Sequence, residues 1–169
     1  MSDRIALSLS ADLHHPFLIA SREELGNLKQ KVQSPPLSDY YARLVAWLTE
    51  HADQPLPDCP PGGLCSNFSD FDARAHLLSN MALSSAVAWW CDSNPKWLQA
   101  ASAALAKLSE WEYWRSPWHL PLPCDLTSGF TSMGVGLAYD LLYEQLDEPL
   151  RMKVQDAIIK HGTTYIMPD

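Results

Sequence analysis

Side chains that suit carbohydrate binding are concentrated in one short stretch, residues 111–125, which holds three tryptophans, a tyrosine, an arginine, a histidine and an aspartate. Indole rings stack on the flat apolar faces of sugars, and a guanidinium group binds a carboxylate through two parallel hydrogen bonds. We therefore expect substrate contacts from four residues of this stretch, Trp114, Arg115, Trp118 and His119. The alternative is that the tryptophans fill the space between helix ends.

A further candidate for binding a carboxylate is Arg74, expected near the start of a long helix. An ion pair with Asp70 or with a neighbouring loop is the alternative role of its guanidinium group. Asp70 and Asp72 resemble the start of a calcium-binding loop, but no further ligands follow at the required spacing, so we expect helix capping and no metal site. Gly134 and Gly136 lack a preceding strand and a third glycine, so no dinucleotide or other cofactor is predicted.

Five other polar residues are expected to have structural roles. Asp125 precedes a helical pattern and should cap that helix. Tyr139 and Asp140 lie in a helix that is predicted to be buried, where the hydroxyl and the carboxylate would bond to neighbouring loops. His14 and His15 precede a proline, and their ring nitrogens are expected to bond to the backbone.

The elements that must position these side chains are helices, because the apolar residues recur at helical spacing along almost the whole chain. Ser21 and Glu24 form a capping box, Ser38 is expected to cap the next helix, and Pro95 suits a first helical turn. Residues 1–20 are predicted to be an extended entry segment. Helices are predicted over residues 22–32, 39–52, 70–92, 95–111, 127–146 and 148–165.

The last four of these helices form two antiparallel hairpins, since short links join the members of each pair. The first helix of each hairpin is rich in small residues that allow close packing on several sides, which is typical of an inner helix. The pattern favours a two-layered α/α array of inner and outer helices, with a plain helical bundle as the alternative. The small residues include Ala82, Ser85, Ala88, Gly134 and Ala138.

Three motifs resemble one family. His15-Pro16-Phe17-Leu18, followed by the 21–28 pattern, is similar to the opening of heparinase II/III-like and alginate-lyase-like polysaccharide lyases. Residues 125–129 and 136–143 resemble the family's Asp-Leu-x-Thr and Ala-Tyr-Asp-Trp-Leu-Tyr helix, with leucine at position 141 where tryptophan is commoner. Residues 146–151 are similar to the start of the family's next helix.

The resemblance implies an all-α domain over residues 1–169, with its antiparallel hairpins forming part of an incomplete (α/α) toroid. It also implies that the chain is the N-terminal part of a longer protein whose toroid continues and is followed by a β-sandwich. Such lyases act on uronic acids through an Asn-His pair and a tyrosine. This sequence has no Asn-His dipeptide, so no catalytic residue is predicted in it.

Charge and composition exclude some classes of partner. The 169 residues include 12 basic and 20 acidic side chains, a net charge of −8, which argues against nucleic acid and anionic membranes. No apolar run is long enough to span a membrane. The first residues do not resemble a signal peptide, so a cytoplasmic location is expected if that start is native. Whether Cys59 and Cys65 pair is left open, with free thiols preferred.

Two hypotheses follow for function. The first is a helical-toroid segment of a polysaccharide lyase that cleaves uronic-acid-containing polysaccharides by β-elimination, with an acidic polysaccharide or oligosaccharide and the rest of the same chain as partners. The second is a non-catalytic helical-repeat module that binds a carbohydrate or a protein. A glycoside hydrolase is a weaker third hypothesis, because Asp125 and Asp140 would stand roughly 22 Å apart along one helix.

Overall fold

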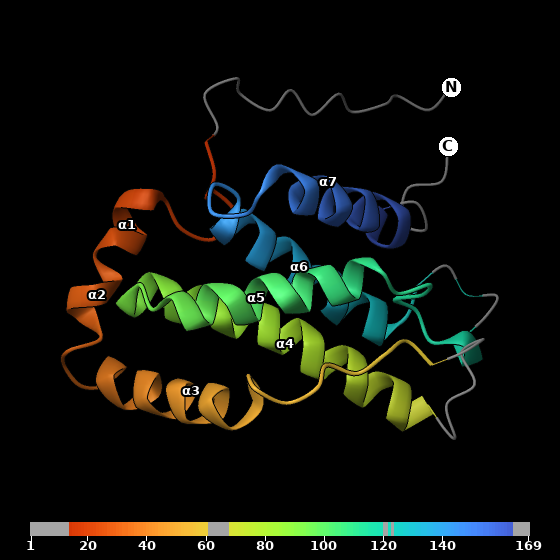
Figure 1. Cartoon of the computed structure of the whole chain (residues 1–169), viewed down its shortest axis with the longest axis horizontal. Coiled ribbons are helices and arrows are strands. Elements are labelled where there is room, and N and C mark those ends of the chain that lie inside the picture. The colour runs from red at the N-terminus through yellow and green to blue at the C-terminus, as the bar shows by residue number, and fades with distance from the viewer. Residues whose placement is uncertain (1–13, 61–67, 120–121, 123, 164–169) are drawn as a thin grey trace.

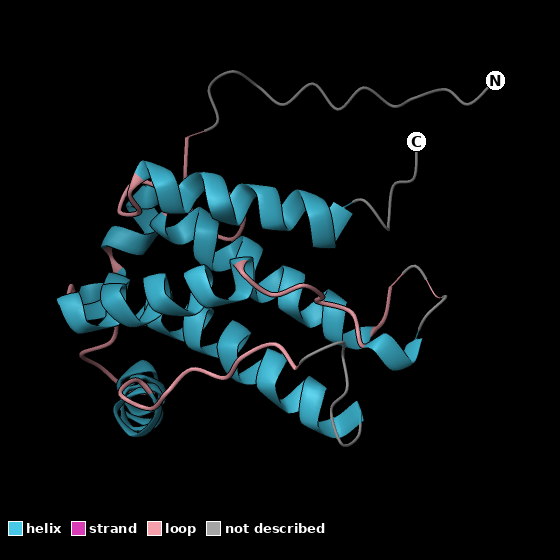
Figure 2. Ribbon diagram, turned by 45° about the vertical axis from the view of Figure 1, so that its right-hand side comes forward, coloured by secondary structure: helices cyan, strands magenta, loops and turns pink. Residues whose placement is uncertain are grey.

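The computed structural model describes residues 14–60, 68–119, 122 and 124–163, and within these residues every regular element is helical (Figures 1 and 2). The protein is therefore all-α, as the sequence predicts. The elements are α1 (Arg22–Gly26), α2 (Leu28–Lys31), α3 (Leu37–His51), α4 (Phe68–Asp92), α5 (Pro95–Ser109), η2 (Pro117–His119), α6 (Leu126–Leu142), α7 (Glu148–Ala157) and η3 (Ile158–Thr163). The last of these, η3, is a short π-helix.

Helices α4 and α6 lie side by side and run in the same direction. Their first turns are joined by Thr127, whose hydroxyl donates to Asp72 over 2.6 Å. Their last turns are joined by Trp90, whose indole N–H donates to the Leu141 carbonyl over 2.9 Å. Between these points Gly134 allows the backbones to approach, because a Cβ atom there would lie 2.8 Å from the Cβ of Ser79.

The other helices of the two hairpins, α5 and α7, run in the opposite direction and also pack on each other (Figure 1). Helices α4 and α6 therefore form one layer and α5 and α7 the other. The core lies between the layers, so apolar side chains of all four helices are buried. The largest of them include Phe71, Leu78 and Met81 of α4, Leu105 and Leu108 of α5, Val135 and Leu142 of α6, and Val154 of α7.

The first predicted helix is split in two. The capping box of Ser21 and Glu24 is present, but the helix over residues 22–32 breaks at Asn27. Asparagine is a poor helix former, and the Asn27 amide donates instead to the Glu23 carbonyl over 3.0 Å.

Other helix ends also differ from the predictions: α5 ends at Ser109 rather than 111, and α6 ends at Leu142 rather than 146. Ser38 does not cap α3, because Pro36 already has helical backbone angles and the Ser38 N–H donates to the Ser34 carbonyl. At the other end of the chain, the predicted helix 148–165 stays α-helical only to Ala157 and then widens into η3. The cap at Asp125 and the placing of Pro95 in a first turn are confirmed, and Asp147 caps α7.

No described helix is both long enough and apolar enough to cross a membrane. In the same residues, no group of three or more His, Cys, Asp or Glu side chains converges as a metal site would require. Cys59 is a free thiol, and Cys65, its possible partner, lies outside the described residues.

Candidate functional site

The first candidate region is the end of the molecule where α4 and α6 begin, at the right of Figure 1, together with η2 and the stretch before α6. The N-termini of two parallel helices meet there, so their unpaired N–H groups and dipoles point the same way. The aromatic stretch that the sequence singles out leads into this end. This is therefore the place where a carbohydrate cleft is expected.

Asp125 organises this region. Its carboxylate caps α6 by accepting from the Ser128 N–H over 2.8 Å, and it also accepts from the Ser116 N–H and from His119 Nδ1, each over 2.9 Å. Only 3% of the Asp125 side chain is exposed, against 37% of His119. The cap predicted for Asp125 is thus confirmed, and the same carboxylate fixes His119 at the surface.

The tryptophans of the stretch do not act as one group. Trp118 is 47% exposed, so its indole can stack on a sugar ring. Trp114 is 1% exposed, and its indole N–H donates to the Leu108 carbonyl over 2.9 Å. Trp114 therefore presents no exposed ring face, and its contact with a substrate stays a prediction. Trp111 is buried as well, against Phe71, so the space-filling alternative holds for these two indoles.

The two predicted carboxylate-binding arginines already have partners. Arg74 forms an ion pair with Asp70, one helical turn away, at 3.1 Å between Nη2 and Oδ2. This is the alternative role that the sequence left open. The half-buried Arg115 donates to the Leu122 carbonyl, which ties its guanidinium group to the same loop. A bound carboxylate would have to share these cations with their present partners.

A small polar cluster in this region was not predicted. Asp72 accepts from Thr127 and lies 3.5 Å from Nε2 of His76, which is too long for a hydrogen bond. The buried His76 Nε2 and Thr131 Oγ1 have no hydrogen-bond partner among the described residues. The His76 ring meets Phe130 edge-on at 5.0 Å. The i,i+4 spacing of Asp72 and His76 is the sequence signal that could have indicated this pair.

A third histidine, His161 of η3, is buried beneath the aromatic stretch. Its ring stacks on Trp114, with centroids 5.2 Å apart. Burial is the main reason why its pKa is lowered to about 4, and the nearby Lys160 acts in the same direction. His161 is therefore a neutral packing residue at pH 7.

The second candidate region lies towards the other end of α6, where Asp140 is 1% exposed. Its carboxylate accepts from His15 Nδ1 over 2.6 Å and from the N–H groups of Phe17 and Leu18, at 3.0 and 2.9 Å. The expectation that Asp140 ties down a neighbouring segment is confirmed. The expectation that His15 bonds to the backbone is wrong for Nδ1, which bonds to the buried Asp140 carboxylate.

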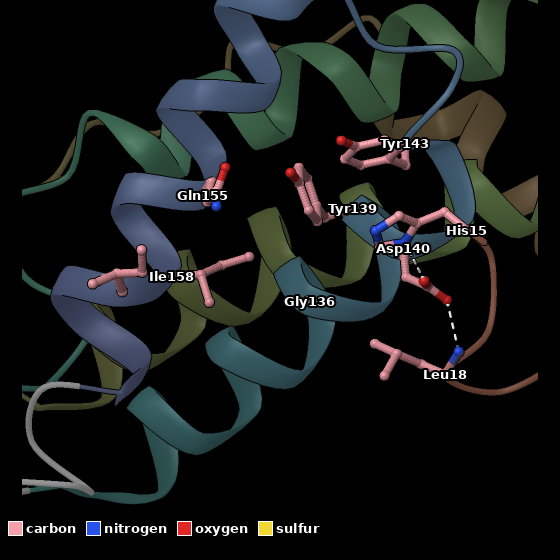
Figure 3. Close-up of a pocket in the computed structure, with 9 residues that line it drawn as sticks. His15, Leu18, Gly136, Tyr139, Asp140, Tyr143, Gln155 and Ile158 are labelled. Carbon is pink, nitrogen blue, oxygen red and sulfur yellow. Dashed lines mark hydrogen bonds and ion pairs between the residues drawn. The ribbon is translucent and has the colours of Figure 1, made fainter. Parts of the chain in front are cut away.

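Beside this contact lies a cavity of about 390 Å³ between the entry segment, α6 and α7 (Figure 3). His15 stacks on Tyr143 with centroids 4.1 Å apart and meets Tyr139 edge-on at 6.0 Å. Burial raises the pKa of Tyr139, so its hydroxyl stays protonated at neutral pH. The cavity was not predicted, and one of the positions that line it, Gly136, has no side chain.

Neither a protein-family model nor a curated protein matches this chain. The resemblance to polysaccharide lyases therefore rests on the three motifs and stays a prediction. The structure adds a relation between two of them. The motif at residues 15–18 and the motif at 136–143 lie against each other through Asp140, although 125 positions separate His15 from that carboxylate.

Proposed function

We propose that the chain is a helical-toroid segment of a polysaccharide lyase-like protein that cleaves uronic-acid-containing polysaccharides by β-elimination. The observation that carries the proposal is the contact between the two most characteristic motifs. Residues 15–18 dock through Asp140 onto the helix that bears residues 136–143. A chance resemblance of two separate segments gives no reason for them to meet, whereas a shared fold does.

The role proposed for this chain is to provide scaffold and one part of the substrate cleft. In β-elimination a base removes the C5 proton of a uronate, the carboxylate charge is neutralised and an acid protonates the leaving oxygen. Trp118 offers an exposed indole for a sugar face, and His119 and Arg115 offer polar groups beside it. No residue of this chain is assigned a catalytic role.

The remainder of a toroid would pack on the open face of α6. Leu126, Phe130 and Met133 follow one another at helical spacing on this helix and are 76%, 46% and 53% exposed. A helix buries such a stripe against another element when one is present. This face supports the proposal that a further hairpin of the same protein continues the array.

A non-catalytic carbohydrate-binding module is the second candidate function. It is favoured because the acidic side chains at the N-terminal ends of α4 and α6 are already held in ion pairs and hydrogen bonds. Asp70 pairs with Arg74, Asp72 accepts from Thr127 and Asp125 holds three donors among the described residues. Carboxylates held in this way position loops and cap helices, and such a surface can bind a sugar without turning it over.

The test is calorimetric titration of the chain with oligosaccharides of alginate, heparan sulfate, hyaluronan and chondroitin. We expect binding of at least one, weakened about fivefold by Trp118→Ala, since an aromatic stack contributes roughly 1 kcal/mol. Met152→Ala, at an exposed position of α7, is the matched control and should bind as the wild type does.

Catalysis is tested separately on the longest natural form of the protein, by the rise in ultraviolet absorbance that an unsaturated uronate produces. A rise supports the lyase. Binding without any rise favours the binding module, and absence of both binding and turnover would overturn the two proposals together.

A further inference from the structure

One residue that lines the cavity beside Asp140 is a glycine, Gly136, and helix packing does not explain why a glycine stands there. Gly136 lies in the middle of α6, where glycine costs about 1 kcal/mol relative to alanine. A Cβ atom at Gly136 would meet no described atom within 4 Å, whereas one at Gly134 would collide with Ser79. Close packing of helices therefore accounts for Gly134 and leaves Gly136 unexplained. What the missing side chain does provide is room in the cavity.

The polar groups around the cavity converge on it. In Figure 3 the hydroxyl groups of Tyr139 and Tyr143 point towards the side of α7 that carries Gln155. His15 gives its Nδ1 hydrogen to Asp140, so its other ring nitrogen is left as an acceptor in the neutral ring. Two phenols, an amide and an imidazole therefore border the same space, and each can donate or accept a hydrogen bond.

The charged groups that line the cavity disfavour a charged ligand. Asp140 is the acidic residue of the lining, and its oxygens are already occupied by His15 and by the N–H groups of Phe17 and Leu18. No lysine or arginine is among the described residues that line the cavity. The remaining walls are rings and aliphatic side chains such as Ile158. Arg151 lies over the Tyr143 ring, with its guanidinium carbon 5.0 Å from the centroid, but it does not line the cavity. An acidic sugar would therefore enter without a cation in direct contact, which is costly in a partly buried site.

We propose that this cavity binds a neutral hydroxylated ring, of which a neutral monosaccharide unit is the simplest case. Its volume of about 390 Å³ falls in the range of small-molecule sites. Ring edges and the aliphatic side chains of Leu18 and Ile158 contact the apolar faces of such a ligand, and the phenol, amide and imidazole groups bind its hydroxyls. The site lies towards the C-terminal end of α6, away from Trp118, and the inference does not rest on the lyase proposal.

The test is saturation-transfer NMR on the 169-residue chain with glucose, galactose, mannose and xylose, and with glucuronate as the acidic comparison. We expect transfer to at least one neutral sugar and little to glucuronate. Gly136→Leu places a side chain in the cavity and should abolish the transfer. Gly129→Leu adds the same side chain at another open position of α6 and should leave it unchanged.

A second variant keeps the proposal open to refutation if Gly136→Leu fails to fold. Tyr139→Phe removes one hydroxyl from the cavity and should weaken binding several-fold, while circular dichroism stays that of the wild type. The proposal is overturned if no neutral sugar shows transfer at millimolar concentration, or if transfer survives in a folded Gly136→Leu protein. It is also overturned if light scattering shows that the cavity instead mediates self-association, with a wild-type dimer that Gly136→Leu alone dissociates.

Discussion

The two ends of α6 carry the same arrangement in different settings. At each end the carboxylate of a buried aspartate side chain accepts hydrogen bonds from a histidine Nδ1 and from two backbone N–H groups. Asp125 gathers partners within nine positions of itself, so it shapes a loop next to its own helix. Asp140 gathers partners more than 120 positions away, so it joins the entry segment to the helical array. The same hydrogen-bonding chemistry thus caps a helix locally at one end of α6 and joins distant segments of the chain at the other.

The largest expected effect comes from removing the long-range carboxylate. Asp140→Ala should lower the free energy of unfolding by about 4 kcal/mol, because a buried charge-assisted network loses its acceptor and two N–H groups lose their partner. Asp125→Ala should cost about 2 kcal/mol, since a helix cap and a more exposed loop are lost. Urea unfolding followed by circular dichroism measures both. Equal losses would contradict the distinction between closure and capping.

The pH dependence of stability tests the burial of His161. The pKa of His161 is lowered from 6.5 to about 4 in the folded protein, so between these values the unfolded chain binds the extra proton. Above pH 6.5 the buried His161 therefore does not reduce the free energy of unfolding. As the pH falls towards 4, the free energy of unfolding decreases by roughly 3 kcal/mol because the unfolded chain binds the proton more readily.

The check is the free energy of unfolding measured between pH 7 and pH 4, for the wild type and for His161→Gln. The variant has no proton to bind at this position, so its stability should fall less steeply with pH. Parallel curves for the two proteins would show that the acid sensitivity originates at other groups.

The smallest expected effect concerns the two glycines of α6. Gly136→Ala should stabilise the protein by about 1 kcal/mol, because alanine favours the helix and its Cβ meets open space. Gly134→Ala should destabilise it, because the new Cβ would press on Ser79 of α4. Thermal unfolding of both variants measures the difference. A stabilised Gly134→Ala protein would show that α4 and α6 can move apart freely.

The parts of the structure that could be predicted are those determined by residues close together in the sequence. The capping box at Ser21, the caps at Asp125 and Asp147, and the two hairpins all follow from short-range patterns. The contact between His15 and Asp140 could not be predicted in the same way, although both residues stood in recognised motifs. Periodicity places a residue on a helix face but does not choose its partner across the fold.

The candidate site shows the same limit. Composition correctly drew attention to the stretch 111–125, but it could not distinguish the exposed Trp118 from the buried Trp114. Burial there depends on how helix ends and η3 meet, and a neighbour such as His161 is remote in sequence. The cavity at Gly136 was missed as well, and one of the positions that line it has no side chain.

The contact made by Asp140 also has a consequence for synthesis on the ribosome. His15 precedes its carboxylate partner by 125 positions, so at ordinary translation rates it is made roughly 6 to 25 s earlier. Late in that interval, once Ser109 has been made, the hairpin of α4 and α5 can form from contacts close in sequence, while the entry segment still lacks Asp140. Docking of residues 15–18 is thus a late event in folding, because it requires α6 to be formed first.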